Sequence, residues 1–141
     1  MADGAGGRPL PALTTTTRPY WTAGADGVWR LQRCPDCRRL IHPPTLRCQF
    51  DHAAPEWEAL SGRGTVESWT VNHHPFYPGI PTPYVIAFVN PVEDPRVRVL
   101  TNLVDVEPDR IHVGMSVRVT FAAGSDDIDD DVYLPLFTAE H

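Results

Sequence analysis

The chain has 141 residues, which indicates one domain of ordinary size or two very small ones. Hydrophobic residues make up 42% of it, enough for a packed core. The formal net charge of −6 argues against a general polyanion binder, because neutralising phosphates requires an excess of Lys and Arg. The apolar runs are too short to span a bilayer and the first residues do not resemble a secretion signal, so we expect a cytoplasmic protein without membrane association.

The first third of the chain predicts a linker, a short helix and a loop-rich module. Residues 1–17 are rich in Gly, Pro, Ala and Thr and are expected to form a flexible linker. A short helix is predicted over residues 17–21, capped by Thr17 or a neighbour, and a short strand over residues 28–32. Residues 34–51 have too few apolar side chains for a core of their own, so this module needs a cross-link to stay folded.

The remainder of the chain predicts a mainly β domain. Five segments are rich in β-branched and aromatic residues: 65–71, 83–90, 96–106, 116–121 and 132–137. Residues 72–83 form a loop with four prolines, residues 107–112 a short connector and residues 124–131 an acidic loop. Five short strands without a long helix favour a five-stranded OB-fold barrel. We therefore predict a helix and a loop-rich ribbon module at residues 18–56 and a barrel at residues 57–141.

The three cysteines indicate which kind of cross-link holds this module together. Cys34 and Cys37 form one Cys-x-x-Cys turn, and Cys48 begins a second turn in which the fourth ligand position falls on Asp51. A carboxylate is an accepted zinc ligand, whereas His52, one step out of register, is the more usual partner of thiolates. His42 is a third choice. An all-disulfide framework would leave one thiol unpaired, so a structural zinc ion is the favoured interpretation.

Other candidate residues point to binding more than to catalysis. His73 and His74 share the proline-rich loop with Phe76 and Tyr77, and no nucleophile or carboxylate is tied to them by sequence. The residues around Tyr20 are expected to dock on the barrel or on another protein. The aspartates of residues 125–131 lack the pattern of a calcium-binding loop, so a solvated hairpin tip is favoured. No catalytic centre is identified.

Charge is unevenly distributed along the chain. Five arginines lie close to the cysteines in sequence, and these are Arg30, Arg33, Arg38, Arg39 and Arg47. They could attract phosphate, whether of nucleic acid or of coenzyme A, or they could balance an anionic zinc site. The sequence leaves both interpretations open.

The order and spacing of several motifs resemble those of the domain of unknown function thirty-five family. The motifs are Pro19-Tyr20-Trp21, Cys34-Pro35-Asp36-Cys37, His42-Pro43-Pro44, Cys48, Trp57, Gly62-Arg63-Gly64, Pro83-Tyr84, residues 113–117 and Leu134-Pro135-Leu136-Phe137. The resemblance covers roughly residues 18–138 and implies a rubredoxin-like zinc ribbon followed by an acyl-CoA-associated OB-fold. Asp51 departs from the family, which commonly has a fourth cysteine there.

The resemblance implies an accessory subunit that is not an enzyme by itself. Family members accompany thiolase-like enzymes that handle acyl-CoA, some are fused to an enoyl-CoA hydratase, and one group completes an aldolase of steroid side-chain degradation. The expected partners are therefore such a thiolase-like enzyme, acyl-CoA at the interface and a fused or associated hydratase. The expected contact residues are Tyr20, Trp21, His73, His74, Phe76, Tyr77 and Tyr84. A single-stranded nucleic-acid-binding module and an enzyme that uses His73 or His74 are the alternatives.

Overall fold

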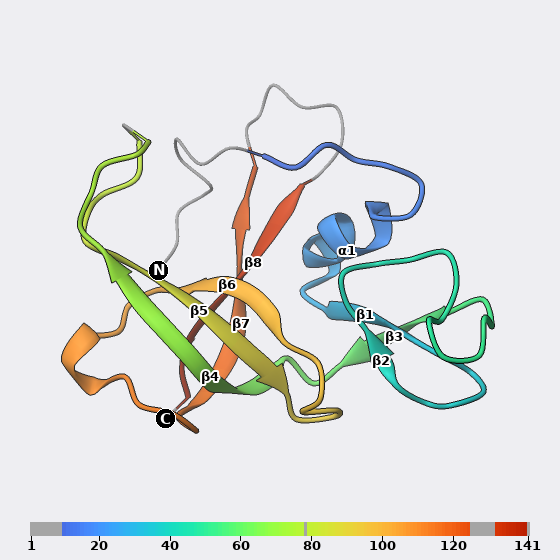
Figure 1. The fold of residues 1–141 in the computed structure, drawn as a ribbon. Helices are drawn as coiled ribbons and strands as arrows, with labels where there is room; N and C mark the ends of the chain where they lie inside the picture. Colours follow the sequence, from blue (N-terminus) through green and yellow to red (C-terminus); the bar gives the residue numbers. More distant parts are fainter. Residues whose placement is uncertain (1–9, 78, 125–131, 141) are drawn as a thin grey trace.

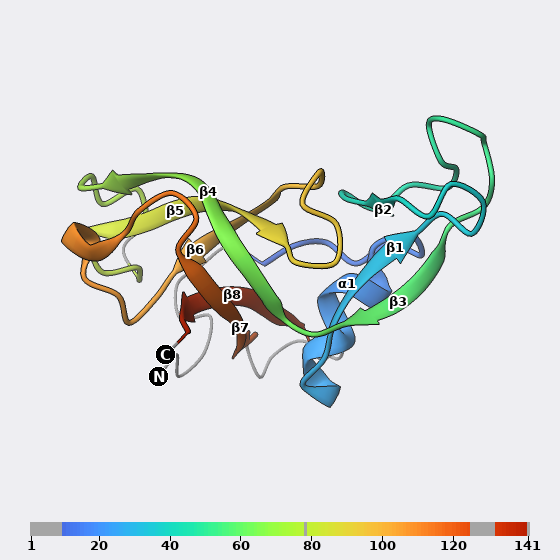
Figure 2. The ribbon, with the colours of Figure 1, turned by 90° about the horizontal axis from the view of Figure 1, so that it is seen from below.

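The computed structural model describes residues 10–77, 79–124 and 132–140, and it contains two β-structures side by side. A three-stranded sheet with the order β2-β1-β3 forms a ribbon, and a closed barrel has the order β4-β5-β6-β8-β7 (Figures 1 and 2). The prediction of a mainly β chain with one short N-terminal helix and a five-stranded barrel is confirmed. The acidic loop at residues 125–131 lies outside the described residues. In the part that is described, no helix is long and apolar enough to cross a membrane.

The N-terminal helix α1 (Arg18–Thr22) lies between the ribbon and the barrel, next to β1 and β8 (Figure 1). Thr17 is its N-cap residue but makes no capping bond with its side chain. Instead, Thr14 Oγ1 accepts a hydrogen bond from Thr17 N at 3.1 Å. A 3-10 helix, η1 (Ala23–Asp26), follows α1 and ends at Gly27, whose φ of 69° is the left-handed conformation that glycine favours.

Gly24 lets this helical segment approach the barrel. A Cβ atom on Gly24 would lie 2.3 Å from Tyr133 Cβ and 2.8 Å from Phe121 Cδ1, and neither the Cβ atom of β8 nor the ring has an easy way to move. Gly24 therefore provides the room that lets the helical segment pack against Phe121 and Tyr133 of the barrel.

We predict that Gly24→Ala destabilises the protein by about 1–3 kcal/mol, because overpacking a close contact forces the backbone apart. Thermal unfolding followed by circular dichroism measures the loss. The control is Gly27→Asn, since no atom lies within 4 Å of a Cβ there and asparagine tolerates positive φ. Equal stability of Gly24→Ala and the unmodified chain would contradict the close-packing argument.

The ribbon consists of β1 (Trp29–Arg33), β2 (Leu40–Ile41) and β3 (Glu56–Leu60). β1 corresponds to the predicted strand, whereas β2 and β3 were not predicted. Gln32 is buried and hydrogen-bonds both backbone polar groups of Thr45, which fixes the loop after β2. β3 pairs with β1 along its whole length, so the ribbon sheet extends to Leu60. The division of the chain at residue 57 stays a prediction.

The barrel consists of β4 (Arg63–Asn72), β5 (Tyr84–Pro91), β6 (Val99–Leu103), β7 (Ser116–Ala123) and β8 (Tyr133–Ala139). These are the five predicted strands. β6 is shorter than the predicted segment 96–106, because residues 94–97 form a turn held by the Asp94 side chain. The predicted connector contains a 3-10 helix, η2 (Pro108–Arg110). Parallel pairing of Leu103 with Phe137 closes the barrel.

One hydrophobic core joins the two β-structures. Trp29 of the ribbon and Phe137 of the barrel are almost fully buried and meet edge to face, with ring centroids 5.0 Å apart. Tyr20, Leu31 and Leu40 belong to the same buried cluster as the barrel valines. Leu10 and Leu13 pack against a second cluster near β8. The ribbon is therefore held on the barrel by continuous apolar contact. A metal ion would stabilise the loops of the ribbon and is not needed to attach the ribbon to the barrel.

Asp94 provides a polar link between the same two parts. Its carboxylate is 4% exposed, accepts a hydrogen bond from Leu40 N of β2 at 3.0 Å and is held by Arg96 at 2.8 and 3.0 Å. Burial by itself would raise the pKa of Asp94, but the hydrogen bonds from Arg96 and Leu40 outweigh it, so this pKa lies below its ordinary value.

We expect Asp94→Ala to cost about 2–3 kcal/mol, because it leaves the buried N–H of Leu40 without an acceptor. A lowered carboxyl pKa contributes stability above the unfolded pKa of about 3.9, and this contribution is lost as pH falls through the folded pKa. Denaturant unfolding measures the free energy of unfolding of Asp94→Ala, of Asp94→Asn and of the unmodified chain. The values for Asp94→Asn and the unmodified chain should differ most above about pH 4 and converge at lower pH. A difference that is independent of pH would contradict this assignment.

Candidate metal centre and adjacent surfaces

Two turns with the same backbone hydrogen bonds surround the candidate metal centre. Cys34 N donates to Arg39 O at 2.9 Å and Arg38 N to Cys34 O at 3.0 Å. In the second turn, Cys48 N donates to Ala53 O and His52 N to Cys48 O, both at 2.9 Å. The repeated pattern puts Asp51 in the second turn at the position that Cys37 holds in the first.

The residue after each turn adopts the left-handed conformation. Arg38 has a φ of 66° and His52 a φ of 64°. His52 therefore corresponds to Arg38, a position that closes the turn. The group of possible ligand atoms consists of Cys34, Cys37, Cys48 and Asp51, and His52 is not part of it. That Asp51 completes a metal site remains a prediction.

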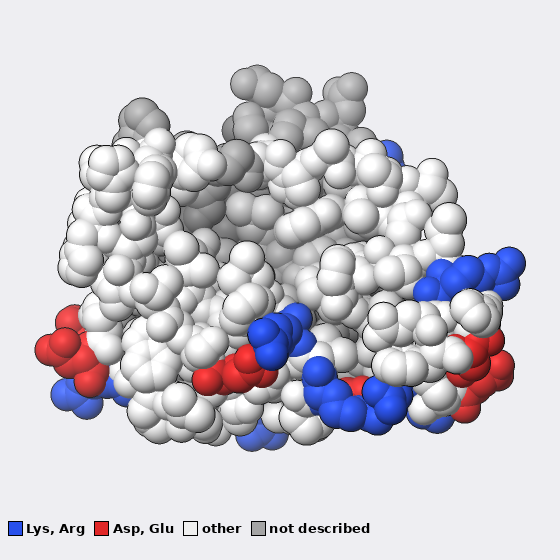
Figure 3. Space-filling model, viewed as in Figure 1, with Lys and Arg blue, Asp and Glu red and all other residues white. Residues whose placement is uncertain are grey.

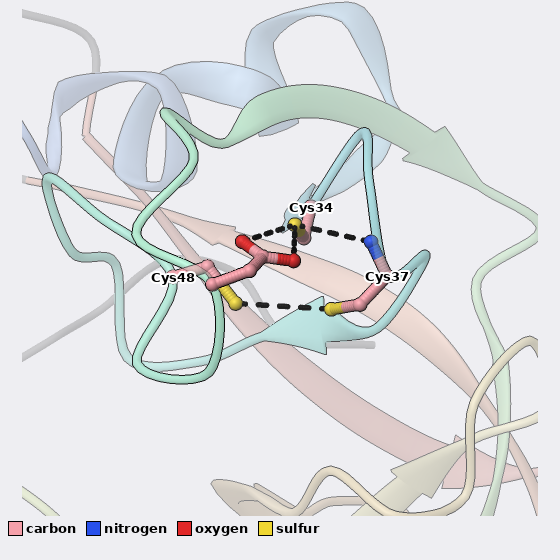
Figure 4. A group of neighbouring side chains, drawn as sticks. Cys34, Cys37 and Cys48 are labelled. Atoms are coloured by element: carbon pink, nitrogen blue, oxygen red, sulfur yellow. Dashed lines mark hydrogen bonds between the residues drawn. The ribbon is translucent and has the colours of Figure 1, made fainter.

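The spacing of the four side chains fits a tetrahedral ion. Their ligand atoms all lie within 4.8 Å of one another. The sulfur atoms of Cys37 and Cys48 are 3.7 Å apart, and Cys34 Sγ lies 3.3 Å from both carboxylate oxygens of Asp51 (Figure 4). Tetrahedral zinc, with Zn–S of about 2.3 Å and Zn–O of about 2.0 Å, would separate two sulfurs by about 3.8 Å and sulfur from oxygen by about 3.5 Å. The three thiols and one carboxylate thus fit zinc.

Backbone N–H groups adjust the protonation of these ligands. The N–H groups of Phe50 and Asp51 lower the pKa of Cys48. Burial raises the pKa of the Cys34 thiol to about 11, although the N–H groups of Cys37 and Asp36 act in the opposite direction. The pKa of Asp51 is lowered, chiefly because Ala53 N donates to Oδ1 at 3.0 Å. A metal ion would bind this carboxylate in its ionised form and would displace the proton of Cys34.

His42, the third choice of ligand, lies apart from this cluster. Its ring packs on Tyr20 with centroids 4.8 Å apart, and burial lowers its pKa to about 4. At neutral pH it is therefore an uncharged imidazole. Its buried Nδ1 has no hydrogen-bond partner among the described residues.

Three of the five arginines near the cysteines form ion pairs with carboxylates. Arg33 and Arg38 pair with Glu58 at 2.8 and 3.8 Å, and Arg30 pairs with Asp26 at 3.5 Å. Arg39 and Arg47 make no ion pair within the described residues. The positive charge of Arg30, Arg33 and Arg38 is therefore partly neutralised by carboxylates outside the candidate metal centre.

The expected contact residues differ in accessibility. Tyr20 is buried in the common core and Trp21 is half-buried, so α1 docks on this chain itself. Phe76 and Tyr77 are 63% and 44% exposed. His74 and Phe76 stack edge to face, with centroids 4.4 Å apart. The exposed side chains His73 and His74 pair with no carboxylate in the part of the chain that is described.

An apolar patch on the outer face of the barrel was not predicted. We define this β4–β6 face by two adjoining hollows of about 200 and 300 Å³ that share Ile86 and Leu100. Trp69 and Phe88 line the first hollow, and Tyr77, Ile80 and Tyr84 line the second. Figure 3 shows an expanse with few charges, and the charged side chains lie mainly at its margins. The available signal was that β5 is apolar at nearly every position, so it offers apolar side chains to both faces.

Two family models together match residues 21–122. The rubredoxin-like zinc ribbon domain of ChsH2 matches residues 21–58, and the C-terminal OB-fold domain of ChsH2 matches residues 57–122.

Three curated relatives are similar to this chain. A probable enoyl-CoA hydratase alpha subunit of Thermomonospora curvata is 35% identical over 92% of the chain, and a 3-oxo-4,17-pregnadiene-20-carboxyl-CoA hydratase alpha subunit of Mycobacterium tuberculosis is 38% identical over 79%. The chain spans only 39% and 35% of their lengths. A DUF35 domain-containing scaffold protein of Methanocaldococcus jannaschii is 32% identical over 71% of this chain and 72% of its own length.

Two solved structures share the fold. A chain of the Ltp2-ChsH2(DUF35) aldolase has a TM-score of 0.79 and 32% identity, covering 92% of this chain and 98% of that one. A DUF35 protein of Sulfolobus solfataricus has a TM-score of 0.61, with coverage of 89% and 86%. Its identity of 13% supports likeness of fold alone.

Proposed function

The chain belongs to the DUF35 family and carries the zinc ribbon and OB-fold of ChsH2, and on that premise we propose that it is a non-catalytic accessory subunit of a thiolase-like acyl-CoA enzyme. The reaction proposed for the complex is retro-aldol cleavage of a steroid-type side chain. The catalytic residues would lie on the partner, and this chain would help to frame the acyl-CoA site. An associated or fused enoyl-CoA hydratase is a further proposed component.

The observation that carries the proposal is the likeness to the DUF35 chain of an aldolase, which extends over 98% of that chain at 32% identity. The described residues are compatible with a role without chemistry of its own. His73 and His74 are exposed and lack a carboxylate partner, and the thiols are gathered with Asp51 at the candidate metal centre. A catalytic site normally unites a nucleophile or base with a group that orients it.

The β4–β6 face is the surface that we assign to the partner. Leu100 is 61% exposed and Trp69 is 36% exposed, although both are large apolar residues on rigid strands. Contiguous apolar surface of this kind typically marks a protein interface, and aromatic residues supply much of the binding energy there. The loop with Phe76 and Tyr77 adjoins the same face through the lining residue Tyr77.

The proposed zinc ion has a structural role. It would join the turn after β1 to the turn that precedes β3, and between them the chain has only the two-residue strand β2. Three thiolates and a carboxylate leave no position for a reacting water in a four-coordinate site. When bound, the ion would supply cross-linking of these loops and no reaction step.

Co-expression of this chain with a candidate thiolase-like partner enzyme tests the proposed function. We expect a complex that survives size-exclusion chromatography with light scattering, with about one zinc per copy of this chain. Cleavage of a steroid acyl-CoA is expected only when both proteins are present. Full activity of the partner alone, or failure of the two proteins to associate, would overturn the proposal.

A further inference from the structure

A cleft of about 460 Å³ lies between the ribbon and the barrel. Its wall combines β2 and the loop after it, the second metal-binding turn and the turn between β5 and β6. The lining residues are Arg39, Leu40, Ile41, His42, Pro43, Thr45, Arg47, Cys48, Gln49, Phe50, Asp94, Arg96, Val97 and Arg98. A volume of this size is in the range of sites for small organic ligands.

The cleft is basic although the protein is acidic. Four arginines and one aspartate line it, whereas the whole chain has a formal charge of −6. The aspartate is Asp94, whose buried carboxylate is already bound by Arg96 and by Leu40 N. Arg98 lies 3.4 Å from Glu67, which is not part of the lining. Positive charge therefore remains available on the cleft wall.

Arg39 and Arg47 are the two arginines of the cleft best placed to bind an anion. Neither has a carboxylate partner among the described residues. The Arg39 guanidinium lies 4.2 Å from the centroid of the Phe50 ring, and Arg47 Nη1 donates to His52 O at 3.3 Å. All 12 Lys and Arg positions of the chain are arginine, the side chain whose planar group binds phosphate through two parallel hydrogen bonds.

Phe50 adds a stacking surface at the same site. Its ring is 57% exposed, so a ligand in the cleft can reach it. A planar heterocycle could stack on this ring or on the guanidinium above it, while attached phosphates reach the neighbouring arginines. The lining thus has places for both parts of a nucleotide.

We propose that this cleft binds an organic phosphate of nucleotide size, with the phosphates on Arg39 and Arg47 and the base on Phe50. Two sources share this chemistry, a free adenine nucleotide and the nucleotide portion of coenzyme A. The coenzyme A source would deepen the proposed function, whereas the site itself does not depend on it, because binding is measurable on this chain without a partner.

The test is titration calorimetry of the zinc-loaded chain with ADP, coenzyme A, adenosine and a single-stranded DNA oligonucleotide. We expect saturable binding of ADP and coenzyme A but not of adenosine, and at least about tenfold weaker binding at 300 mM than at 50 mM NaCl. Coenzyme A that binds about tenfold more tightly than ADP identifies coenzyme A as the source, while equal affinity identifies the nucleotide.

The variants Arg39→Gln and Arg47→Gln should each weaken binding about tenfold, since each removes a charge-assisted contact. Arg118→Gln is the matched control, because Arg118 is an exposed arginine of β7 that does not line the cleft. Zinc content and thermal midpoint establish that every variant is folded. Absence of binding, equal affinity of all three variants, or saturable binding of single-stranded DNA alone would overturn the proposal.

Discussion

Replacing Cys48 with serine is expected to abolish stoichiometric zinc and to lower the melting temperature by more than about 10 °C. Cys48 is almost fully buried, lies 3.7 Å from the Cys37 sulfur and begins the second turn. Without this thiolate the two turns lose their cross-link, and the loops around β2 have little other structure to hold them. Zinc assay by atomic emission and thermal unfolding measure the two effects.

Asp51→Cys is the informative companion variant. It should preserve stoichiometric zinc and bind it more tightly than the unmodified chain does, because thiolate is the softer match for zinc. His52→Gln should leave zinc binding unchanged, since His52 occupies the position that closes the turn. Competition with a chromophoric chelator gives the order of affinities. Loss of zinc in His52→Gln with retention in Asp51→Ala would reverse the assignment of the fourth ligand.

If the proposed complex with a thiolase-like enzyme forms, Leu100→Glu is expected to weaken it by at least about 30-fold. Leu100 lies at the centre of the β4–β6 face and lines both of its hollows. A carboxylate there would be buried without a partner at the proposed interface, whereas in the free chain it would remain in water. Binding measured by interferometry should therefore fall while the melting temperature of the free chain changes little.

Val113→Glu is the matched control for this prediction. Val113 is 70% exposed, precedes β7 and lines neither hollow of the β4–β6 face. The substitution Val113→Glu introduces the same charge at an apolar position of similar exposure. Equal loss of binding in both variants would mean that charge in general, and not this face, governs association. Unchanged binding in Leu100→Glu would exclude the β4–β6 face as the interface without affecting the accessory role itself.

The features that sequence predicted correctly are those governed by local rules. Enrichment in β-branched and aromatic residues located the five barrel strands, and in β7 it is joined by alternation, which Val117 and Phe121 illustrate. The strands β2 and β3 escaped prediction because one has two residues and the other, with Glu56 and Glu58, has a polar composition. Both form because β1 offers them a partner, which is a tertiary effect.

The sequence by itself determined the spacing that brings Asp51 to the three thiols, because each turn is closed by hydrogen bonds among five or six consecutive residues. Only the tertiary structure decided which side chains meet across distant segments. It buried Tyr20 in the shared core, joined Arg39 and Arg47 to the turn at Asp94–Arg98, and gathered Trp69 with Leu100 on one face. These encounters depend on how the ribbon packs against the barrel and on how strands pair. Neither the packing of the ribbon on the barrel nor the pairing of the strands can be predicted from a local sequence pattern. Both follow from the burial of apolar surface over the whole chain.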